Sequence, residues 1–82
     1  MPKKSDYAKR FEISESAVAL ALAKKVKKLR AENGWSQAEL ARRVGIQTAA
    51  ISHIENARGN PTLETMDALA RSFGVSVSSL LQ

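Results

Sequence analysis

The chain has 82 residues, 44% of them hydrophobic and only 5% aromatic, so one small domain with an aliphatic core is expected. It contains no cysteine and a single histidine, which excludes disulfides and leaves too few residues for a cysteine- or histidine-based metal site. No apolar run approaches the roughly 20 residues that span a bilayer and no signal peptide is recognisable, so a cytoplasmic location is expected.

The net charge of +5 favours a polyanionic partner, but this charge is unevenly distributed along the chain. Residues 1–30 contain nine Lys or Arg against three acidic residues, whereas residues 31–82 contain four against five. The basic charge is therefore concentrated in the first 30 residues. Taken alone, this distribution would suit DNA, RNA or an anionic membrane surface equally well.

The N-terminal part of the chain is predicted to be an arm followed by a helix. Residues 1–13 have mixed charge, an early proline and no sustained apolar period, which is typical of an arm outside the folded domain of residues 14–82. Ser14 offers an N-cap for a helix over about residues 15–32, which Gly34 would end. The opening of this helix, residues 17–23 (AVALALA), is apolar on more than one side, which predicts that a second surface is covered there.

Two short amphipathic helices are predicted next, joined across one glycine. Ser36 and Glu39 form a capping box, so the first of these helices begins at Gln37. The second is expected over about residues 48–56. Helices this short are unstable alone, and they must pack against each other at a steep angle across Gly45, which can adopt a positive φ at little steric cost. This arrangement is typical of a helix-turn-helix, whose second helix lies in the DNA major groove.

The C-terminal part is predicted to contain two further helices. Residues 57–61 (ARGNP) form a loop, after which Thr62 caps a fourth helix that Gly74 closes. Ser76 caps a final short helix that ends at residues 80–81. No stretch alternates with period two, so no strand is expected. The predicted fold class is therefore all-α, with five helices and no internal repeat.

Several motifs, in order and without gaps, resemble the Cro/Xre-type helix-turn-helix family of phage repressors and small bacterial regulators. They are the spacing of Leu22, Val26, Leu29 and Arg30, then WSQAELARRVGI, ISHIEN and NPTLETMDALARSFGVSVSSLL. The resemblance covers about three quarters of the chain and implies a five-helix, lambda-repressor-like DNA-binding domain with the helix-turn-helix at its second and third helices. The GWSQAEL stretch is also similar to the HipB-type antitoxins of this family.

The resemblance implies a role for individual residues as well. The side chains that would face base edges are Gln47, Thr48, Ala49, Ser52 and His53. Those that would contact DNA phosphates are Ser36, Gln37, Arg43, Asn56 and Arg58. Gln37 would act at a helix N-terminus, which suits an anion, and Arg30 would pair with Glu55 beneath the reading helix. Because several reading side chains are short, thymine methyl contacts and DNA shape would carry part of the specificity.

A homodimer is expected, because one such domain makes too few contacts for specific binding in a genome. Two copies spaced about 34 Å apart would read a palindromic double-stranded DNA operator. The C-terminal residues that are more apolar than a monomer needs are Val75, Val77, Leu80 and Leu81. Part of this set would fill the core, and the rest would form the dimer interface. No cofactor and no metal are expected.

Two alternatives to a repressor stay open. An antitoxin would clamp a toxin protein with residues 17–23 and the arm, and would use DNA binding to regulate its own operon. A controller protein of a restriction–modification system is a nearer variant. An enzyme is not expected, since the sequence offers no carboxylate pair, Gly-rich phosphate loop or nucleophile–base pair. Ser52 and His53 do not form such a pair, because adjacent helical residues point about 100° apart.

Overall fold

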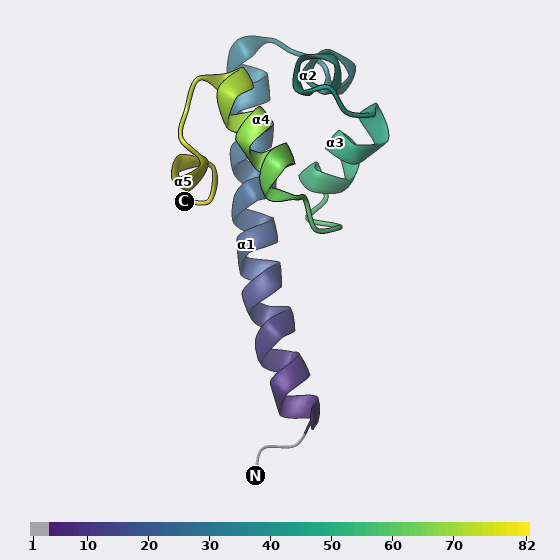
Figure 1. The fold of residues 1–82 in the computed structure, drawn as a ribbon, viewed down its shortest axis with the longest axis vertical. Helices are drawn as coiled ribbons and strands as arrows, with labels where there is room; N and C mark the ends of the chain where they lie inside the picture. Colours follow the sequence, from purple (N-terminus) through teal and green to yellow (C-terminus); the bar gives the residue numbers. More distant parts are fainter. Residues whose placement is uncertain (1–3) are drawn as a thin grey trace.

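The computed structural model describes the backbone of residues 4–82 and the side chains of residues 17–82. It contains the helices α1 (Lys4–Asn33), α2 (Gln37–Val44), α3 (Thr48–Glu55), α4 (Leu63–Phe73) and α5 (Val77–Leu80). No strand occurs within residues 4–82. The predicted all-α class and the five helices are therefore confirmed. Figure 1 shows α1 as a long shaft, with the other four helices gathered around its C-terminal half.

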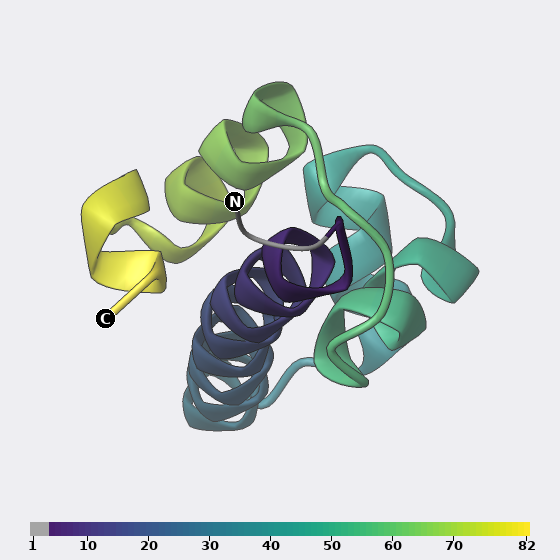
Figure 2. The ribbon, with the colours of Figure 1, turned by 90° about the horizontal axis from the view of Figure 1, so that it is seen from below.

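The first helix is longer than the sequence indicated. α1 begins at Lys4, so Ser14 does not cap it, and residues 4–13, which were expected as an arm, are helical. Lys, Ala, Arg and Glu are good helix formers, and no glycine or proline follows Pro2 in this stretch, so helix propensity outweighs the missing apolar period. This part of α1 extends away from the other helices in Figure 1, and Figure 2 looks along it from below.

The ends of the shorter helices follow the local signals of the sequence. The residues that cap α2, α4 and α5 are Ser36, Thr62 and Ser76, and each accepts a hydrogen bond from the backbone N–H three residues later. Gly45 ends α2 with φ 83° and Gly74 ends α4 with φ 69°, a left-handed conformation that favours glycine. These caps fix where each helix starts and stops, and they thereby fix the lengths of the connecting turns.

The core lies between the C-terminal half of α1 and the other four helices, and it is aliphatic. Its buried members are Leu22, Val26, Leu40, Ala41, Ile51, Ile54, Leu69, Ala70 and Leu80. Leu80 was expected at the homodimer interface, but it is fully buried because α5 packs against α1 and α4. Leu80 therefore belongs to the part of the C-terminal apolar set that fills the core. Val75, Val77 and Leu81 are partly buried at its edge.

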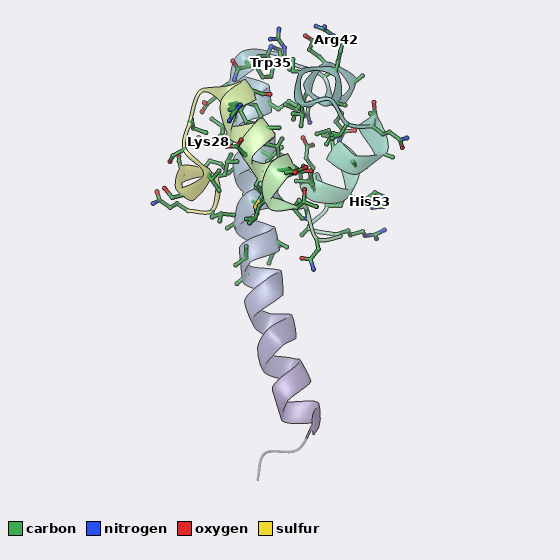
Figure 3. The ribbon with its side chains drawn as sticks, in the orientation of Figure 1. Lys28, Trp35, Arg42 and His53 are labelled. Atoms are coloured by element: carbon green, nitrogen blue, oxygen red, sulfur yellow. The ribbon has the colours of Figure 1, made fainter. Side chains whose placement is uncertain are left out.

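An aromatic stack closes the core at the corner between α1 and α2. The rings of Trp35 and Phe73 lie 5.6 Å apart between centroids, with their planes inclined by 16°. The guanidinium of Arg43 lies 4.2 Å from the centroid of the Trp35 ring. Such stacks and cation–π contacts contribute about 0.5–1.5 kcal/mol each. The stack therefore joins α2, through Arg43, and α4, through Phe73, to the turn after α1. Trp35, its central member, is labelled in Figure 3.

Candidate nucleic-acid interface

A steep turn holds α2 and α3 against each other. The N–H groups of Gly45 and Ile46 both donate to the carbonyl of Ala41, at 2.8 and 3.0 Å. Ala41 is only 2% exposed, and its small side chain lets the two helices cross closely. Across the turn, Leu40 and Ile51 are both fully buried in the shared core. The direction of α3 is therefore set by packing against α2 as well as by the turn itself.

The predicted base-reading side chains lie together on the outer surface of α3 or just before it. Gln47, Thr48, Ala49 and His53 are exposed and Ser52 is half-buried. The inner side of α3 is occupied by Ile51 and Ile54, which are 0% and 6% exposed. Figure 3 shows the labelled His53 projecting away from the body of the domain. The surface formed by these five residues, Gln47, Thr48, Ala49, Ser52 and His53, is called the α3 outer surface below.

The start of α3 bears on the role of Gln47. The resemblance implies a capping serine or threonine at the position of Gln47, and α3 begins at the next residue, Thr48. Gln47 adopts an extended N-cap backbone conformation, with φ −77° and ψ 148°, and its side chain makes no capping hydrogen bond. The side chain is therefore not used to start the helix, and it remains exposed beside Thr48.

A buried ion pair connects the C-terminal end of α3 to α1 and α2. The carboxylate of Glu55, a residue 3% exposed, accepts hydrogen bonds from Arg30 Nε at 2.6 Å and from Arg30 Nη2 at 2.9 Å. Arg30 Nη1 donates to the carbonyl of Trp35 at 2.9 Å, and Gln37 Nε2 donates to Glu55 Oε1 at 3.1 Å. This cluster of Arg30, Trp35, Gln37 and Glu55 therefore holds α3 in position on α1 and α2.

The cluster also sets the charge state of Glu55. Burial alone would raise the pKa of this carboxyl, but the hydrogen bonds from Arg30 and Gln37 and the charges of Arg30 and Lys27 lower it below the ordinary value of 4.5. The same hydrogen bond to Glu55 raises the pKa of Arg30. Both groups are therefore charged at neutral pH, and the bidentate geometry is that of a strong charge-assisted pair.

At the N-terminus of α2, two residues expected to contact phosphate already have partners. Ser36 Oγ accepts a hydrogen bond from the backbone N–H of Glu39 at 3.0 Å, as an N-cap should. The side chain of Gln37 is directed to Glu55, whereas the resemblance implied that it contacts phosphate. The buried carboxylate of Glu55 can only accept hydrogen bonds, so it competes with a phosphate for the side-chain amide of Gln37. The backbone N–H of Gln37 remains at the helix N-terminus, where an anion is favoured.

Arg43, the third expected phosphate contact, is engaged on the aromatic stack. Its Nε donates to Glu39 Oε1 at 2.8 Å while its guanidinium lies over Trp35. Arg42 binds the same carboxylate through Nη2 at 2.7 Å, and this hydrogen bond is the main reason that the pKa of Glu39 is lowered. Glu39 therefore partly neutralises both arginines, and Arg43 packs against Trp35 although 43% of its side chain stays exposed.

The last two expected phosphate contacts follow α3 in a tight turn. The side chain of Asn56 donates to the carbonyl of Ser52 at 2.7 Å, and the N–H of Arg58 donates to the carbonyl of His53 at 2.8 Å. Arg58 is exposed, and no ion pair joins it to another side chain of residues 17–82. Of the expected phosphate contacts, Arg58 thus offers a charge that no described acidic side chain neutralises.

The arrangement of α2 and α3 matches that of a known protein family. A family model described as helix-turn-helix matches residues 26–80, which is more than half of the chain. The chain belongs to the Cro/Xre-type helix-turn-helix family. This is a family of DNA-binding transcriptional regulators, and the helix-turn-helix is formed here by α2 and α3. The resemblance recognised from the sequence motifs is therefore confirmed.

Two curated helix-turn-helix relatives match much of the chain. Antitoxin HipB of Escherichia coli K12 is 42% identical over 57 residues, which cover 70% of this chain and 65% of HipB. A hypothetical transcription factor of Neisseria meningitidis is 34% identical over 67 residues, which cover 82% of this chain and 63% of that protein. The chain thus spans just under two thirds of the length of these relatives.

Solved helix-turn-helix structures share the fold. The crystal structure of a hypothetical transcription factor from Neisseria has a TM-score of 0.78 and 34% identity, covering 83% of this chain and 78% of that one. The structure of SinR, a master regulator for biofilm formation, in complex with DNA has a TM-score of 0.69 and 32% identity. The match covers 74% of this chain and 98% of the SinR chain.

Among the helices that the structure describes, none combines the length and the apolar character of a membrane-spanning segment.

The turn after α3 supplies a stability prediction for this helix-turn-helix. Ala57 has φ 56° and is the only non-glycine residue with positive φ among those described. Glycine tolerates this conformation without the clash of a Cβ atom, so Ala57→Gly should raise the free energy of unfolding by about 0.5–1 kcal/mol. Ala68→Gly, inside α4, is the matched control and should lower it by about 1 kcal/mol. Urea unfolding followed by circular dichroism measures both, and losses of equal size would contradict the left-handed turn.

Proposed function

We propose that this protein is a sequence-specific, double-stranded DNA-binding transcriptional regulator, acting as a repressor, in which α3 enters the major groove. The observation that carries the proposal is the α3 outer surface, where four exposed side chains and the half-buried Ser52 are all polar or small, while two isoleucines anchor the helix from beneath. The buried cluster around Glu55 supports it, because a helix that reads bases must be held rigidly. The likeness to SinR, whose structure contains DNA, also supports it.

The proposed regulator acts as a homodimer on a palindromic operator. Val75, Val77 and Leu81 are partly exposed around α5, and they supply the apolar surface for a second copy once Leu80 is assigned to the core. Two copies double the number of base and phosphate contacts, which raises the affinity for a specific site above that for random DNA. Occupancy of the operator would block transcription, and the protein would act on DNA in the cytoplasm.

Selection of bound duplexes from a random pool, at stated salt concentration, tests this proposal most directly. The expected result is a two-fold symmetric motif whose half-sites lie one helical turn apart, bound by two copies as judged from the mass of the complex. Recovery of duplexes without any shared motif, or a complex that contains one copy, would contradict sequence-specific binding by a homodimer.

Arg58 is predicted to contribute affinity without contributing sequence preference. Because its charge has no acidic partner among the described side chains, Arg58→Gln should weaken the binding of all duplexes alike and reduce the slope of log K against log salt by about 1. Arg71→Gln is the matched control, since this α4 arginine is 81% exposed but pairs with Asp67. Equal effects of both variants on the salt slope would show that Arg58 contacts no phosphate.

A second candidate function is that of an antitoxin, and one observation favours it. Val18 and Leu20 on α1 are 50% and 52% exposed, although apolar side chains of this size are usually buried. A toxin protein that covers this part of α1 would account for the exposed side chains, and the 42% sequence identity to antitoxin HipB agrees with this function. An adjacent methyltransferase gene would instead favour a restriction–modification controller.

Co-expression with the product of an adjacent toxin-like gene tests the antitoxin function. A stable complex should form with the wild-type chain, and Val18→Glu with Leu20→Glu should disrupt it. The control is Leu63→Glu on α4, because Leu63 is also apolar and is 78% exposed. Complexes of equal stability in all three proteins would exclude α1 as the toxin-binding surface.

A further inference from the structure

A hollow of about 430 Å³ opens between α3 and the loop that leads to α4. Its apolar lining includes Ile46, Ala50, Ile54 and Pro61, all of them buried or half-buried. The exposed side chains of His53 and Arg58 also line it. None of these residues belongs to the cluster around Glu55, so the hollow is a feature separate from the support of α3. Its volume lies at the lower end of the range for small-molecule sites.

The lining determines which chemistry fits the hollow. Most of it is apolar, which suits an aromatic ring or a branched aliphatic body. Arg58 is the permanently charged side chain of the lining, and no carboxylate lies among the described residues that form it. The N-terminal end of α4, capped by Thr62, borders the same hollow and adds a partial positive charge. An occupant with one negative charge and an apolar body complements both features.

We propose that this hollow binds a small apolar monoanion, such as an aromatic carboxylate or sulfonate. The anionic group lies on Arg58, and the apolar body lies against Ile46, Ala50 and Ile54. Because His53 and Arg58 also belong to the surface proposed to contact DNA, an occupied hollow hinders DNA binding and makes the ligand an inducer. This competition rests on the proposed function, whereas binding of the monoanion does not.

Two fluorescent probes that differ in charge test the site on the free protein. The probes are 8-anilinonaphthalene-1-sulfonate, an apolar monoanion, and N-phenyl-1-naphthylamine, which has the same ring system without the sulfonate. The wild-type chain should bind the sulfonate saturably at one site. Arg58→Gln should lower the affinity for the sulfonate about fivefold and change that for the amine less than twofold. Ala50→Leu, which fills the hollow, should lower both affinities about tenfold.

Controls separate this site from general binding of an apolar dye. Arg42→Gln removes an exposed arginine on α2 outside the hollow and should leave both affinities within twofold of the wild type. Urea unfolding shows that each variant is folded. When the sulfonate is added to the wild type, the NMR chemical-shift changes of backbone amides should concentrate at residues 46–54 and 58–65, which line the hollow. The proposed site is contradicted if Arg42→Gln and Arg58→Gln lose equal affinity for the sulfonate, or if Ala50→Leu loses none. It is also contradicted if the chemical-shift changes centre on the exposed Val18 and Leu20.

A second measurement tests the competition with DNA. Saturating sulfonate probe should lower the affinity of the wild-type chain for a labelled duplex at least threefold, as measured by fluorescence anisotropy. The same ratio in Ala50→Leu should be close to one. Unchanged DNA affinity with the probe bound would overturn the competition but not the site. If the chain binds no duplex even without the probe, the competition and the proposed DNA-binding function both fail, and the probe titrations alone decide the site.

Discussion

Replacing Glu55 with alanine should lower the free energy of unfolding by about 3 kcal/mol at pH 7. The substitution removes the acceptor of two Arg30 hydrogen bonds and leaves that arginine, which is 24% exposed, without its counter-charge. It also removes the acceptor of the Gln37 amide. Breaking a buried pair from one side costs about 3–5 kcal/mol, and the partial exposure of Arg30 places the expected loss at the lower end.

The control for this loss is Glu32→Ala, since Glu32 is an exposed carboxylate near the end of α1. An exposed residue of this kind should change the free energy of unfolding by less than about 0.5 kcal/mol. Urea unfolding followed by circular dichroism gives both values. If the two variants lose similar amounts, the cluster around Glu55 does not hold α3 in place.

The dependence of this loss on pH checks its electrostatic origin. The pKa of Glu55 is lowered in the folded protein, so the folded carboxyl binds its proton at lower pH than the unfolded one. The stabilisation is therefore fully present above the unfolded value of about 4.5, and it declines as the pH falls through the lower folded value. The difference between wild type and Glu55→Ala should thus be constant above about pH 5.5 and shrink below about pH 4.5. A constant difference down to pH 3 would mean that the loss comes from packing.

The helix-turn-helix could be predicted from the sequence because its signals are local. Ser36 and Glu39 are three residues apart and define the start of α2 by themselves. Gly45 marks the turn, since few other residues adopt its φ of 83°. The outward direction of His53 follows from the isoleucines beside it, which occupy the inner side of α3. Each of these predictions depends on residues within one or two helical turns.

The features that could not be predicted depend on partners far apart in the chain. Gln37 reaches Glu55 across 18 residues, and Trp35 stacks on Phe73 from another helix. Sequence spacing alone does not tell which acceptor a flexible amide selects, because several are within its reach once the helices pack. The prediction of where α1 begins was wrong for a different reason. It relied on a repeating pattern of apolar residues, whereas the residues after Pro2 have enough helix propensity to form a helix without that pattern.

The engagement of Arg43 changes which charges are left for DNA. Because Arg42 and Arg43 share the single carboxylate of Glu39, α2 keeps a net charge of only +1. The exposed lysines of α1 then become important, and Lys27 lies close enough to Glu55 to lower its pKa. The charge of Lys27 on α1 therefore acts on the C-terminal end of α3, where Glu55 lies. Electrostatic attraction to DNA in this protein is expected to come from the lysines of α1 more than from α2.

Placing a negative charge on the α3 outer surface should have the largest effect on DNA binding. Ala49→Glu should lower the affinity for the selected operator at least a hundredfold, because the carboxylate would face base edges and phosphates at close range. Stability should be nearly unchanged, since Ala49 is exposed and glutamate favours helix. Ala31→Glu adds the same charge at an exposed position near the end of α1, and it should reduce affinity less than fivefold.

The same surface should determine which bases are preferred. Replacing Thr48 and His53 together with alanine removes a methyl-bearing side chain and a hydrogen-bonding ring from α3 while leaving the buried isoleucines in place. Selection from a random pool should then yield a motif with weaker preference at two or more positions of each half-site, whereas the affinity for random DNA should change little. Because phosphate contacts carry no sequence information, a motif identical to that of the wild type would mean that α3 positions the protein on DNA and that another element reads the bases.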